Sequence, residues 1–597
     1  MNLLLAHPGL PIAYTCNVAL FSIKPVKNWR SYIPIFDVLR RYRAGDFSHD
    51  LVAGIILGVI TVPQAVAYAF LAGLPAQAGL YACLLPMIMY AILGSSRELV
   101  VGPVAVAALM VAATVKEFAP AYSYEYLSIT TVLSLQAGLL LWILRLSQMG
   151  GIVNLMSHPV VTGFVNAAAL IIILSQLLPF TGQEAQVGNT TWDNLAALAG
   201  TYNTINPATT LIGVIGLVIL FACQRYGHLL LKPFMEVDDD SPANRVGPML
   251  VVLVSVLAVI GFNLDERFGV ATVGHIPAGL PSWTIPPFHP QLWLDLAPSA
   301  AIIALVAYVE SFTVATMLAT RRRQRVNSHQ DLIALGAANI SAAFTGAYPV
   351  AGSFSRSSVN FSAGARTPIS AIVCAAIIIV TLIALTPLFE RLPHAALAAI
   401  IGASVFSLLD FSSLRGHWRF YHHDVITHVV TMLSVLITNV ETGLLIGVAT
   451  SIALFIRRSS RPTVTLIGRI PNSEIFRSTK HHDVETSKHV AAVRVDENIY
   501  FANAYQVENR LLKVVQTKPN TRHMLIVMSS VNLIDVTGLE MLVRVNQNLS
   551  RMDIKLHLSE VKSKVMDQLQ TTALPIDLSG NLFFSTDQAM RDLAERV

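Results

Sequence analysis

Two charged side chains occur within otherwise apolar runs, and both could do chemistry there. Glu310 lies in the segment 307–312, and Arg356 lies between serines at the start of another apolar region. A charge at the centre of a bilayer costs roughly 2.5–3.5 kcal/mol even on a lenient scale, so such residues are functional candidates by default. A carboxyl can take up and release a proton, and a guanidinium can hold an oxyanion through two parallel hydrogen bonds. The alternatives are a structural glutamate held by hydrogen bonds and an arginine that only neutralises it.

Two uncharged polar residues accompany them in the first long apolar segment. Gln64 and Tyr68 are four positions apart, so they share one face of a helix. Both side chains can donate a hydrogen bond to an oxyanion. A plain hydrogen bond to a neighbouring helix is the competing interpretation for each of them.

Glycine and proline interrupt two apolar regions at corresponding places. The sequences VVGPVA (100–105) and YPVAGSFSR (348–356) each precede a short apolar helix. These helices start 53 and 57 residues into two halves that open near residues 50 and 296. Interrupted segments at matching positions are the best sequence pointer to the substrate site of a transporter.

A helix that begins inside a membrane leaves unpaired backbone N–H groups and a positive dipole end at that depth. Two such ends that face each other make an anion site, and irregular backbone is tolerated there only where it lines a cavity or is buried. The alternative is two proline-kinked helices without a ligand. The predicted proton-coupling residue is Glu310, and the predicted substrate-binding residues are Gln64, Tyr68, Gly102, Val104, Ala105, Ser353, Phe354, Ser355 and Arg356.

The composition indicates a membrane protein that must position these residues. Apolar residues make up 54% of the 597 residues, and charged residues make up 13%, about half of the roughly 25% found in soluble proteins. The apolar runs predict fourteen membrane segments, most of them long enough to be spans and the rest short helices. They lie near 50–72, 77–94, 103–116, 125–147, 154–179, 205–224, 246–263, 296–319, 331–347, 353–364, 367–388, 393–409, 422–439 and 441–456. The segments at 103 and 353 are too short to cross a bilayer alone.

The basic residues predict the orientation of these spans. An even number of spans with the N-terminus inside places most lysines and arginines on the cytoplasmic side, as the positive-inside rule requires. Both termini are then cytoplasmic. The inner set includes Arg40, Arg41, Arg43, Arg97, Arg145, Arg225, Arg321, Arg322, Arg323, Arg325, Arg415, Arg457 and Arg458, whereas the outer set is Lys116, Arg267 and Arg391.

The chain divides into three predicted parts. Residues 1–45 form a cytoplasmic N-terminal segment, of which 1–23 read as a disordered or interfacial extension, and residues 46–460 form the transmembrane domain. In the soluble part, 461–597, strands are predicted at 489–495, 523–528 and near 555–558. Helices are predicted near 504–515, 537–549 and 562–571. Alternating strands and helices predict an α/β sandwich.

Several other chemistries are disfavoured. The chain has no Gly-Lys pair and therefore no phosphate-binding loop of the Walker A type. The pairs His422-His423 and His481-His482 lack supporting ligands, so we expect no metal site and no cofactor. The arginine run 321–325 follows a span, which favours membrane topology over nucleic-acid binding. No nucleophile or acid–base cluster indicates an enzyme.

Taken together, the motifs resemble the SulP family of anion transporters, known in animals as solute carrier family 26. The resemblance covers about 33–590. It rests on TVPQAVAYA (61–69) with AGLP (72–75) and GLY (79–81), on GSSRE (94–98) with VGPVA (101–105), and above all on GSFSRSSVNFSAG (352–364), which is similar to the sulfate-permease branch. The tail resembles the STAS domain, with DVTGL (535–539) at the expected loop before a helix.

The resemblance implies fourteen spans in two inverted seven-span repeats, a division into core and gate domains, an elevator-type motion and homodimerisation. It places the anion site between the third and tenth spans and aligns Glu310 with the family's second-half acidic residue. We therefore expect proton-coupled sulfate symport across the cell membrane, with bicarbonate transport, C4-dicarboxylate transport and anion exchange as alternatives. In related soluble STAS proteins a phosphorylated serine follows the aspartate, but here Val536 occupies that place and Thr537 could serve only by analogy. A cytosolic partner of the STAS domain is a further possibility.

Overall fold

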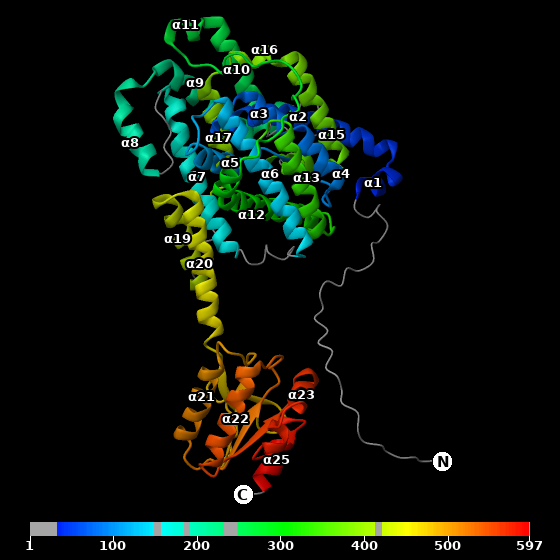
Figure 1. Cartoon of the computed structure of the whole chain (residues 1–597), viewed down its shortest axis with the longest axis vertical. Coiled ribbons are helices and arrows are strands. Elements are labelled where there is room, and N and C mark those ends of the chain that lie inside the picture. Colours follow the sequence, from blue (N-terminus) through cyan, green and yellow to red (C-terminus); the bar gives the residue numbers. More distant parts are fainter. Residues whose placement is uncertain (1–32, 149–156, 184–190, 232–246, 412–420, 596–597) are drawn as a thin grey trace. The chain divides into compact units, whose positions relative to one another are not determined.

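The computed structural model describes residues 33–148, 157–183, 191–231, 247–411 and 421–595. The predicted extension 1–23 lies outside these residues. The chain separates into two compact units, residues 1–447 and 448–597. Each unit has its own architecture, helical in the first and mixed in the second (Figure 1).

The first unit consists of helices apart from two short strands. Its elements are α1 (Ile35–Arg41), α2 (Ala44–Leu71), α3 (Ala76–Tyr81), α4 (Leu85–Leu93), β1 (Val101–Gly102), α5 (Ala105–Val115), α6 (Tyr124–Leu146), α7 (His158–Thr181), α8 (Thr191–Thr201), α9 (Pro207–Leu231), α10 (Gly247–Phe262), α11 (Leu264–Phe268), α12 (Pro290–Arg321), α13 (Ser328–Phe344), β2 (Ala351–Gly352), α14 (Phe354–Ser362), α15 (Ile369–Val380), α16 (Pro387–Glu390), α17 (His394–Phe406), α19 (His422–Ile437) and α20 (Val440–Ser459), the last of which continues into the second unit. A π-helical stretch, Thr381–Leu385, continues α15.

Each of the fourteen apolar segments predicted from the sequence is occupied by helix. Within the described residues, seven are long and apolar enough to cross a membrane, and five more are shorter apolar helices. The remaining two segments are α13 and α14. That all fourteen belong to a membrane domain of two inverted repeats stays a prediction.

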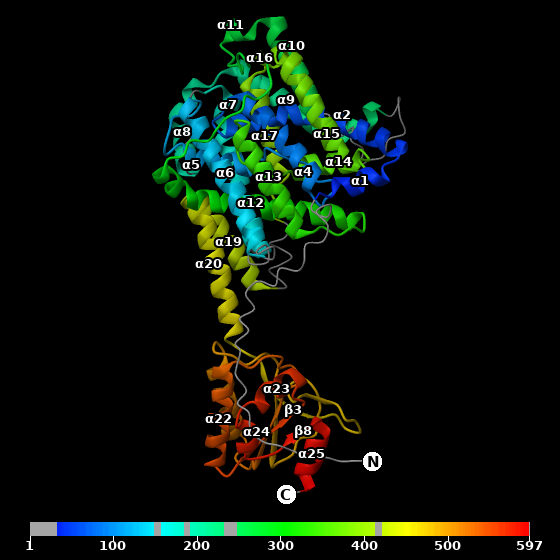
Figure 2. The ribbon, with the colours of Figure 1, turned by 45° about the vertical axis from the view of Figure 1, so that its right-hand side comes forward.

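Small residues let the helices of the first unit approach closely. Helix α13 packs against both α6 and α4 (Figure 2). At the crossing with α6, a Cβ atom added to Gly138 would lie 2.8 Å from the backbone oxygen of Gly336 and 2.8 Å from the backbone nitrogen of Ile340. Only glycine fits there, because any side chain would have to push two helix backbones apart.

The second unit is a six-stranded mixed sheet covered by helices on both faces. The strands are β3 (Val464–Arg469), β4 (Phe476–Ser478), β5 (Val490–Val495), β6 (His523–Val527), β7 (Lys555–Ser559) and β8 (Leu582–Phe583), in the spatial order β4-β3-β5-β6-β7-β8. Strands β5 to β8 are parallel to one another, whereas β3 is antiparallel to both of its neighbours. The helices are α21 (Ala504–Thr517), α22 (Val536–Ser550), α23 (Ser563–Gln570), α24 (Leu574–Asp577) and α25 (Thr586–Glu595).

Alternation along the central strands divides the apolar side chains between two cores. In β5, Ala491 and Val493 pack in the core that includes residues of α21, α22 and α23, and Val490 and Ala492 pack in the core that includes residues of α25. The predicted α/β sandwich is confirmed, and its predicted strands are β5, β6 and β7. The pattern did not predict β3, β4, β8 or α25.

Candidate anion site

The two glycine- and proline-containing interruptions come together in the folded chain. Strand β1 pairs with β2 in antiparallel fashion, with Val101 opposite Gly352 and Gly102 opposite Ala351. The backbone nitrogen of Ser353 extends the pairing by donating to the carbonyl of Val100 at 3.0 Å. The two strands lead directly into α5 and α14, so their pairing brings the first turns of both short helices to one place.

Buried polar side chains hold these strands in position. The backbone nitrogen of Gly352 donates to Ser311 Oγ at 2.7 Å, and that of Val350 donates to Asn339 Oδ1 at 2.9 Å. In the first interrupted segment, the backbone nitrogen of Val100 donates to Ser357 Oγ at 2.9 Å. These bonds satisfy backbone groups that an irregular segment would otherwise leave unpaired in an apolar interior.

The first turns of α5 and α14 supply the positive ends of two helix dipoles. Helix α5 begins after Val104, whose backbone is extended, and α14 begins after Ser353. Ser353 Oγ accepts the backbone N–H of Arg356 at 3.4 Å, which caps one of the N–H groups of α14. The other first-turn N–H groups of a helix have no partner within it and are available to an anion.

Arg356 lies fully buried at this junction. One Nη donates to the carbonyl of Pro103 at 2.6 Å, and this bond joins α14 to the segment just before α5. Its Nε and its other Nη have no hydrogen-bond partner among the described residues. A Cβ atom on Gly102 would lie 3.2 Å from the same guanidinium, so a glycine there leaves the arginine room. The guanidinium is thus fixed at one nitrogen and open at two others.

Glu310 lies on α12 directly before Ser311, the residue whose Oγ accepts the backbone N–H of Gly352 in β2. Its carboxylate and the Arg356 guanidinium interact electrostatically. Among the described residues, Glu310 and Arg356 are not in ion-pair contact with each other. Arg356 instead donates a hydrogen bond to the Pro103 carbonyl. The carboxylate is therefore near the guanidinium and is not locked to it in this conformation.

The remaining predicted residues surround the same junction from two sides. Gln64 and Tyr68 are buried on α2, which packs against both α5 and α14, and Gln64 Oε1 has no partner among the described residues. The Tyr68 hydroxyl interacts electrostatically with Arg356. Val104, Ala105 and Ser353 are buried, Ser355 is half-buried, and the Phe354 side chain is 41% exposed.

Two residues near the junction were not predicted. Tyr348 is fully buried, its hydroxyl has no partner among the described residues, and it interacts electrostatically with Arg356. Cys83 is also fully buried and lies 3.5 Å from a Cβ placed on Gly102. Tyr348 opens the second interrupted segment, and its place beside the proline was the available signal. Nothing in the local sequence marks Cys83.

No group of three or more histidine, cysteine, aspartate or glutamate side chains in the described part of the chain is placed to hold a metal ion. The polar groups that the junction offers are its helix ends, its hydroxyl and amide groups, Arg356 and Glu310.

Comparison with known proteins accounts for both units. Residues 47–431 match the Sulfate permease family, and residues 481–590 match the STAS domain. The chain is similar to "Sulfate transporter 4.1, chloroplastic" of Arabidopsis thaliana, with 32% identity across 92% of this chain and 80% of the relative. It is also similar to "High affinity sulfate transporter 2" of Stylosanthes hamata, with 29% identity across 94% of this chain and 88% of the relative.

Solved structures show the same fold. The murine solute carrier 26 family member A9 anion transporter in the inward-facing state superposes with a TM-score of 0.86 at 22% identity, covering 98% of this chain and 97% of that one. The transmembrane domain of the cyanobacterial bicarbonate transporter BicA superposes with a TM-score of 0.57 at 21% identity, covering 69% of this chain and 98% of that one. The fold, the paired half-helices and the matched residues together show that the chain is a multi-pass membrane protein of the sulfate permease family of anion transporters, with a C-terminal STAS domain.

Proposed function

We propose that this protein carries sulfate across a membrane as a secondary transporter and that protons accompany the anion. The observation that carries the proposal is the fully buried Arg356 at the junction of two helix N-termini, where two of its nitrogens have no hydrogen-bond partner among the residues that the structure describes. A buried guanidinium that no carboxylate contacts directly is incompletely compensated, and an oxyanion would supply the missing hydrogen-bond acceptors and charge. The plant relatives named above are sulfate transporters, which supports sulfate as that oxyanion.

The residues of the junction suit a tetrahedral dianion. Arg356 can donate from Nε and its second Nη, and the first-turn N–H groups of α5 and α14 can donate from two directions. Gln64, Tyr68 and Ser355 add side-chain donors, and the exposed ring of Phe354 bounds the site. Charge neutralisation comes from one arginine and two dipole ends, so the site favours small, strongly charged anions.

Glu310 is the proposed proton carrier. Moving a dianion into a cell against a membrane potential of about 100 mV costs about 4.6 kcal/mol, at about 2.3 kcal/mol per charge. One accompanying proton halves this cost, and two protons cancel it. When Glu310 is ionised it competes with sulfate for Arg356, and when it is protonated Arg356 is available to the anion. Protonation and sulfate binding therefore favour each other, which is the condition for symport.

The transport step is proposed to follow an elevator mechanism in which a core domain that carries α5 and α14 moves against a gate domain. We further propose that the protein acts as a homodimer in the cell membrane with both termini cytoplasmic. One of the plant relatives is described as chloroplastic, so an organellar membrane is a real alternative for a protein of this kind. Mass photometry of the detergent-solubilised protein would test the dimer, and a particle with the mass of one chain would contradict it.

The second candidate function is transport of bicarbonate, and the structural likeness to the BicA transmembrane domain favours keeping it. A C4-dicarboxylate carrier or an anion exchanger would use the same site. Competition distinguishes these substrates. Uptake of radiolabelled sulfate into proteoliposomes should be unaffected by excess bicarbonate, succinate or fumarate and should be suppressed by unlabelled sulfate. If sulfate is not taken up and one of the competitors is transported, that competitor is the substrate in place of sulfate.

A further inference from the structure

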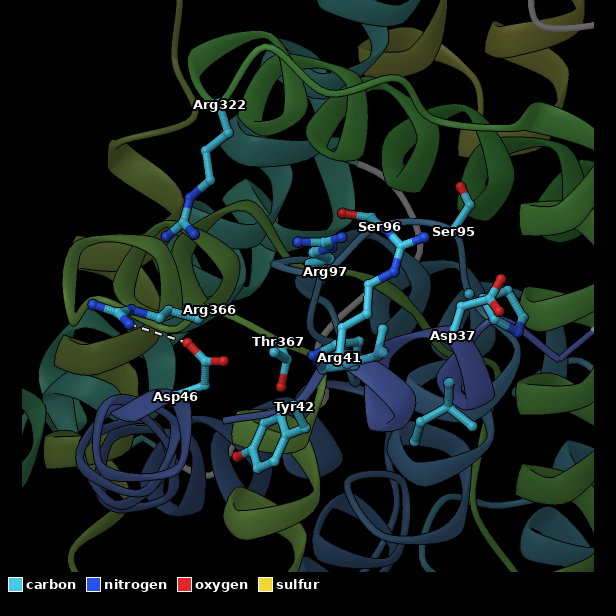
Figure 3. A pocket seen from close by; sticks show the side chains of 15 residues that line it. Asp37, Arg41, Tyr42, Asp46, Ser95, Ser96, Arg97, Arg322, Arg366 and Thr367 are labelled. Atoms are coloured by element: carbon cyan, nitrogen blue, oxygen red, sulfur yellow. Dashed lines mark hydrogen bonds and ion pairs between the residues drawn. The ribbon is translucent and has the colours of Figure 1, made fainter. Parts of the chain in front are cut away.

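A cavity away from the anion site is lined by four arginines. Its volume is about 560 Å³, within the range of about 300–1,000 Å³ typical of small-molecule sites. Arg41, Arg97, Arg322 and Arg366 line it together with Asp37 and Asp46, which leaves an excess of two positive charges (Figure 3). These arginines come from four different parts of the sequence, so the fold gathers them.

The elements place this cavity at one surface of the membrane. Arg41 precedes the long helix α2, Arg97 follows the candidate span Ala76–Leu93, and Arg322 is the C-cap of α12. Three ends of spans that meet at one cavity lie at the same membrane face, which the positive-inside rule predicts to be cytoplasmic. The cavity is therefore at the depth of lipid headgroups and is also open to soluble ions.

Two of the four arginines are already engaged. Arg322 forms an ion pair with the buried Glu98, with 3.3 Å between Nε and Oε1, and donates to the carbonyl of Ala365 at 2.6 Å. Arg366 forms an ion pair with Asp46, with 3.0 Å between Nη1 and Oδ1. These two cations are held in place and contribute positive potential to the cavity.

The other two arginines are available. Neither Arg41 nor Arg97 takes part in an ion pair of the described residues, although Arg97 acts on Glu98 at longer range. Both side chains are exposed, and Figure 3 shows them with Arg322 around the same opening. Tyr42 adds no negative charge near neutral pH, and burial and the neighbouring Asp50 raise its pKa further, to about 12.

Apolar side chains lie beside the cavity on α1 and α2, the two helices that supply Asp37 and Asp46 to its lining. On α1, Leu39 is 49% exposed, and in the first turns of α2, Phe47 is 49% exposed. A short helix with exposed apolar residues and arginines at its end is typical of the membrane interface. An acyl chain could lie against these residues while its headgroup occupies the cavity.

We propose that this cavity binds a phosphate group, through Arg41 and Arg97 as its main ligands, with Arg322 and Arg366 as supporting cations. Arginine is the side chain best suited to phosphate, since its planar fork matches two phosphate oxygens. The phosphate can belong to an anionic lipid or to a soluble ion. Because Arg97 lies in the segment between α4 and β1, the ligand would tie α1 to the segment that leads to the anion site.

The test measures the melting temperature of the full-length protein in phosphatidylcholine nanodiscs. One arm adds phosphatidic acid to the nanodisc, and the other adds inorganic phosphate to the buffer at constant ionic strength set with chloride. A ligand that binds the folded state raises the melting temperature. An increase with phosphatidic acid alone identifies a lipid headgroup, and an increase in both arms identifies a phosphate that also binds from solution.

Substitutions locate the binding. Arg41→Gln and Arg97→Gln should each weaken the affinity about tenfold, as expected for loss of a charged hydrogen bond. Arg40→Gln is the matched control, because Arg40 is exposed on the same helix but does not line the cavity. Equal melting temperature shifts in the wild type and in the Arg41→Gln/Arg97→Gln variant, or no shift in either arm, would overturn the proposal. The readout is binding, so it is independent of whether sulfate is the transported anion.

Discussion

Arg356 is fully buried, yet two of its guanidinium nitrogens have no hydrogen-bond partner among the described residues. Its one hydrogen bond, to the Pro103 carbonyl, orients the side chain and leaves its other N–H donors unused. A buried donor left without a partner costs about 1–3 kcal/mol, and more when it is charged. An anion that accepts these bonds relieves that cost, which is why the residue is central to the proposed site.

Replacing Arg356 with lysine tests its geometry and keeps its charge. A lysine is a point charge and cannot donate both to the Pro103 carbonyl and, through two parallel bonds, to an oxyanion. We expect Arg356→Lys to raise the KM for sulfate about tenfold or more, since a hydrogen bond to a charged group contributes about 1.5–3 kcal/mol. Sulfate uptake by the purified variant in proteoliposomes measures this. An unchanged KM would show that the arginine does not bind the anion.

Glu310 determines the expected dependence on pH. Protonation removes the negative charge that competes with sulfate for Arg356, so uptake by the wild type should rise as the outer solution becomes more acidic. Glu310→Gln mimics the protonated carboxyl and should retain sulfate binding while uptake becomes insensitive to outer pH. Its matched control is Glu441→Gln, which alters another carboxylate of the same unit, one that accepts a hydrogen bond from Thr114 at 2.8 Å. A Glu310→Gln variant that kept the full pH response would contradict this role.

Individual site residues were predictable to the extent that a local pattern marks them. Glu310 and Arg356 stand out because charge is rare in apolar segments, and Gln64 and Tyr68 because four positions make one helical turn. The bond from Arg356 to the Pro103 carbonyl joins positions 253 residues apart, and no local pattern encodes it. Tyr348 lies in the same interrupted segment as Arg356 and beside its proline, but that its side chain is buried and interacts with Arg356 depends on how this segment folds.

At the scale of elements, the essential feature is the pairing of β1 with β2. Each strand has only two residues, and together they align the starts of α5 and α14. The sequence indicated two interrupted helices at matching positions, but strands this short are invisible to any periodicity. Likewise β4 and β8 are too short to be recognised, whereas β5 and β6 are mainly apolar and buried, and in β7 two buried leucines alternate with polar residues.

The crossing of α6 and α13 gives a prediction at this scale. Gly138→Ala places a methyl group 2.8 Å from backbone atoms of α13, so the helices must separate. We expect a loss of about 1–3 kcal/mol of stability, the usual effect of overpacking, and a lower melting temperature. Gly261→Ala on α10 is the control, because a Cβ there meets nothing within 4 Å. That variant should be neutral or slightly stabilising, as alanine favours helix by up to about 1 kcal/mol. Equal melting temperatures for the two variants would contradict the close packing.

At the scale of the whole molecule, the helical unit contains the proposed transport site, and the sheet unit contains none of its residues. In the STAS domain, Asp535 caps α22 by accepting the backbone N–H of Gly538 at 2.8 Å, and it also accepts the backbone N–H of Phe501 at 2.8 Å. Asp535 therefore has a structural role in this loop. Val536, which follows it, is exposed and carries no group that could be phosphorylated.

If sulfate and protons cross the membrane together, an inward proton gradient must drive sulfate uptake into proteoliposomes. Radiolabelled sulfate is added outside vesicles that contain the full-length protein, with the outside either more acidic than the inside or at equal pH. A gradient of about two pH units is worth about 2.7 kcal/mol per proton, enough to accumulate sulfate above its outer concentration. We expect sulfate to accumulate with the acid gradient and the accumulation to collapse when a protonophore is added. Sulfate uptake that is the same with and without the gradient would contradict proton coupling.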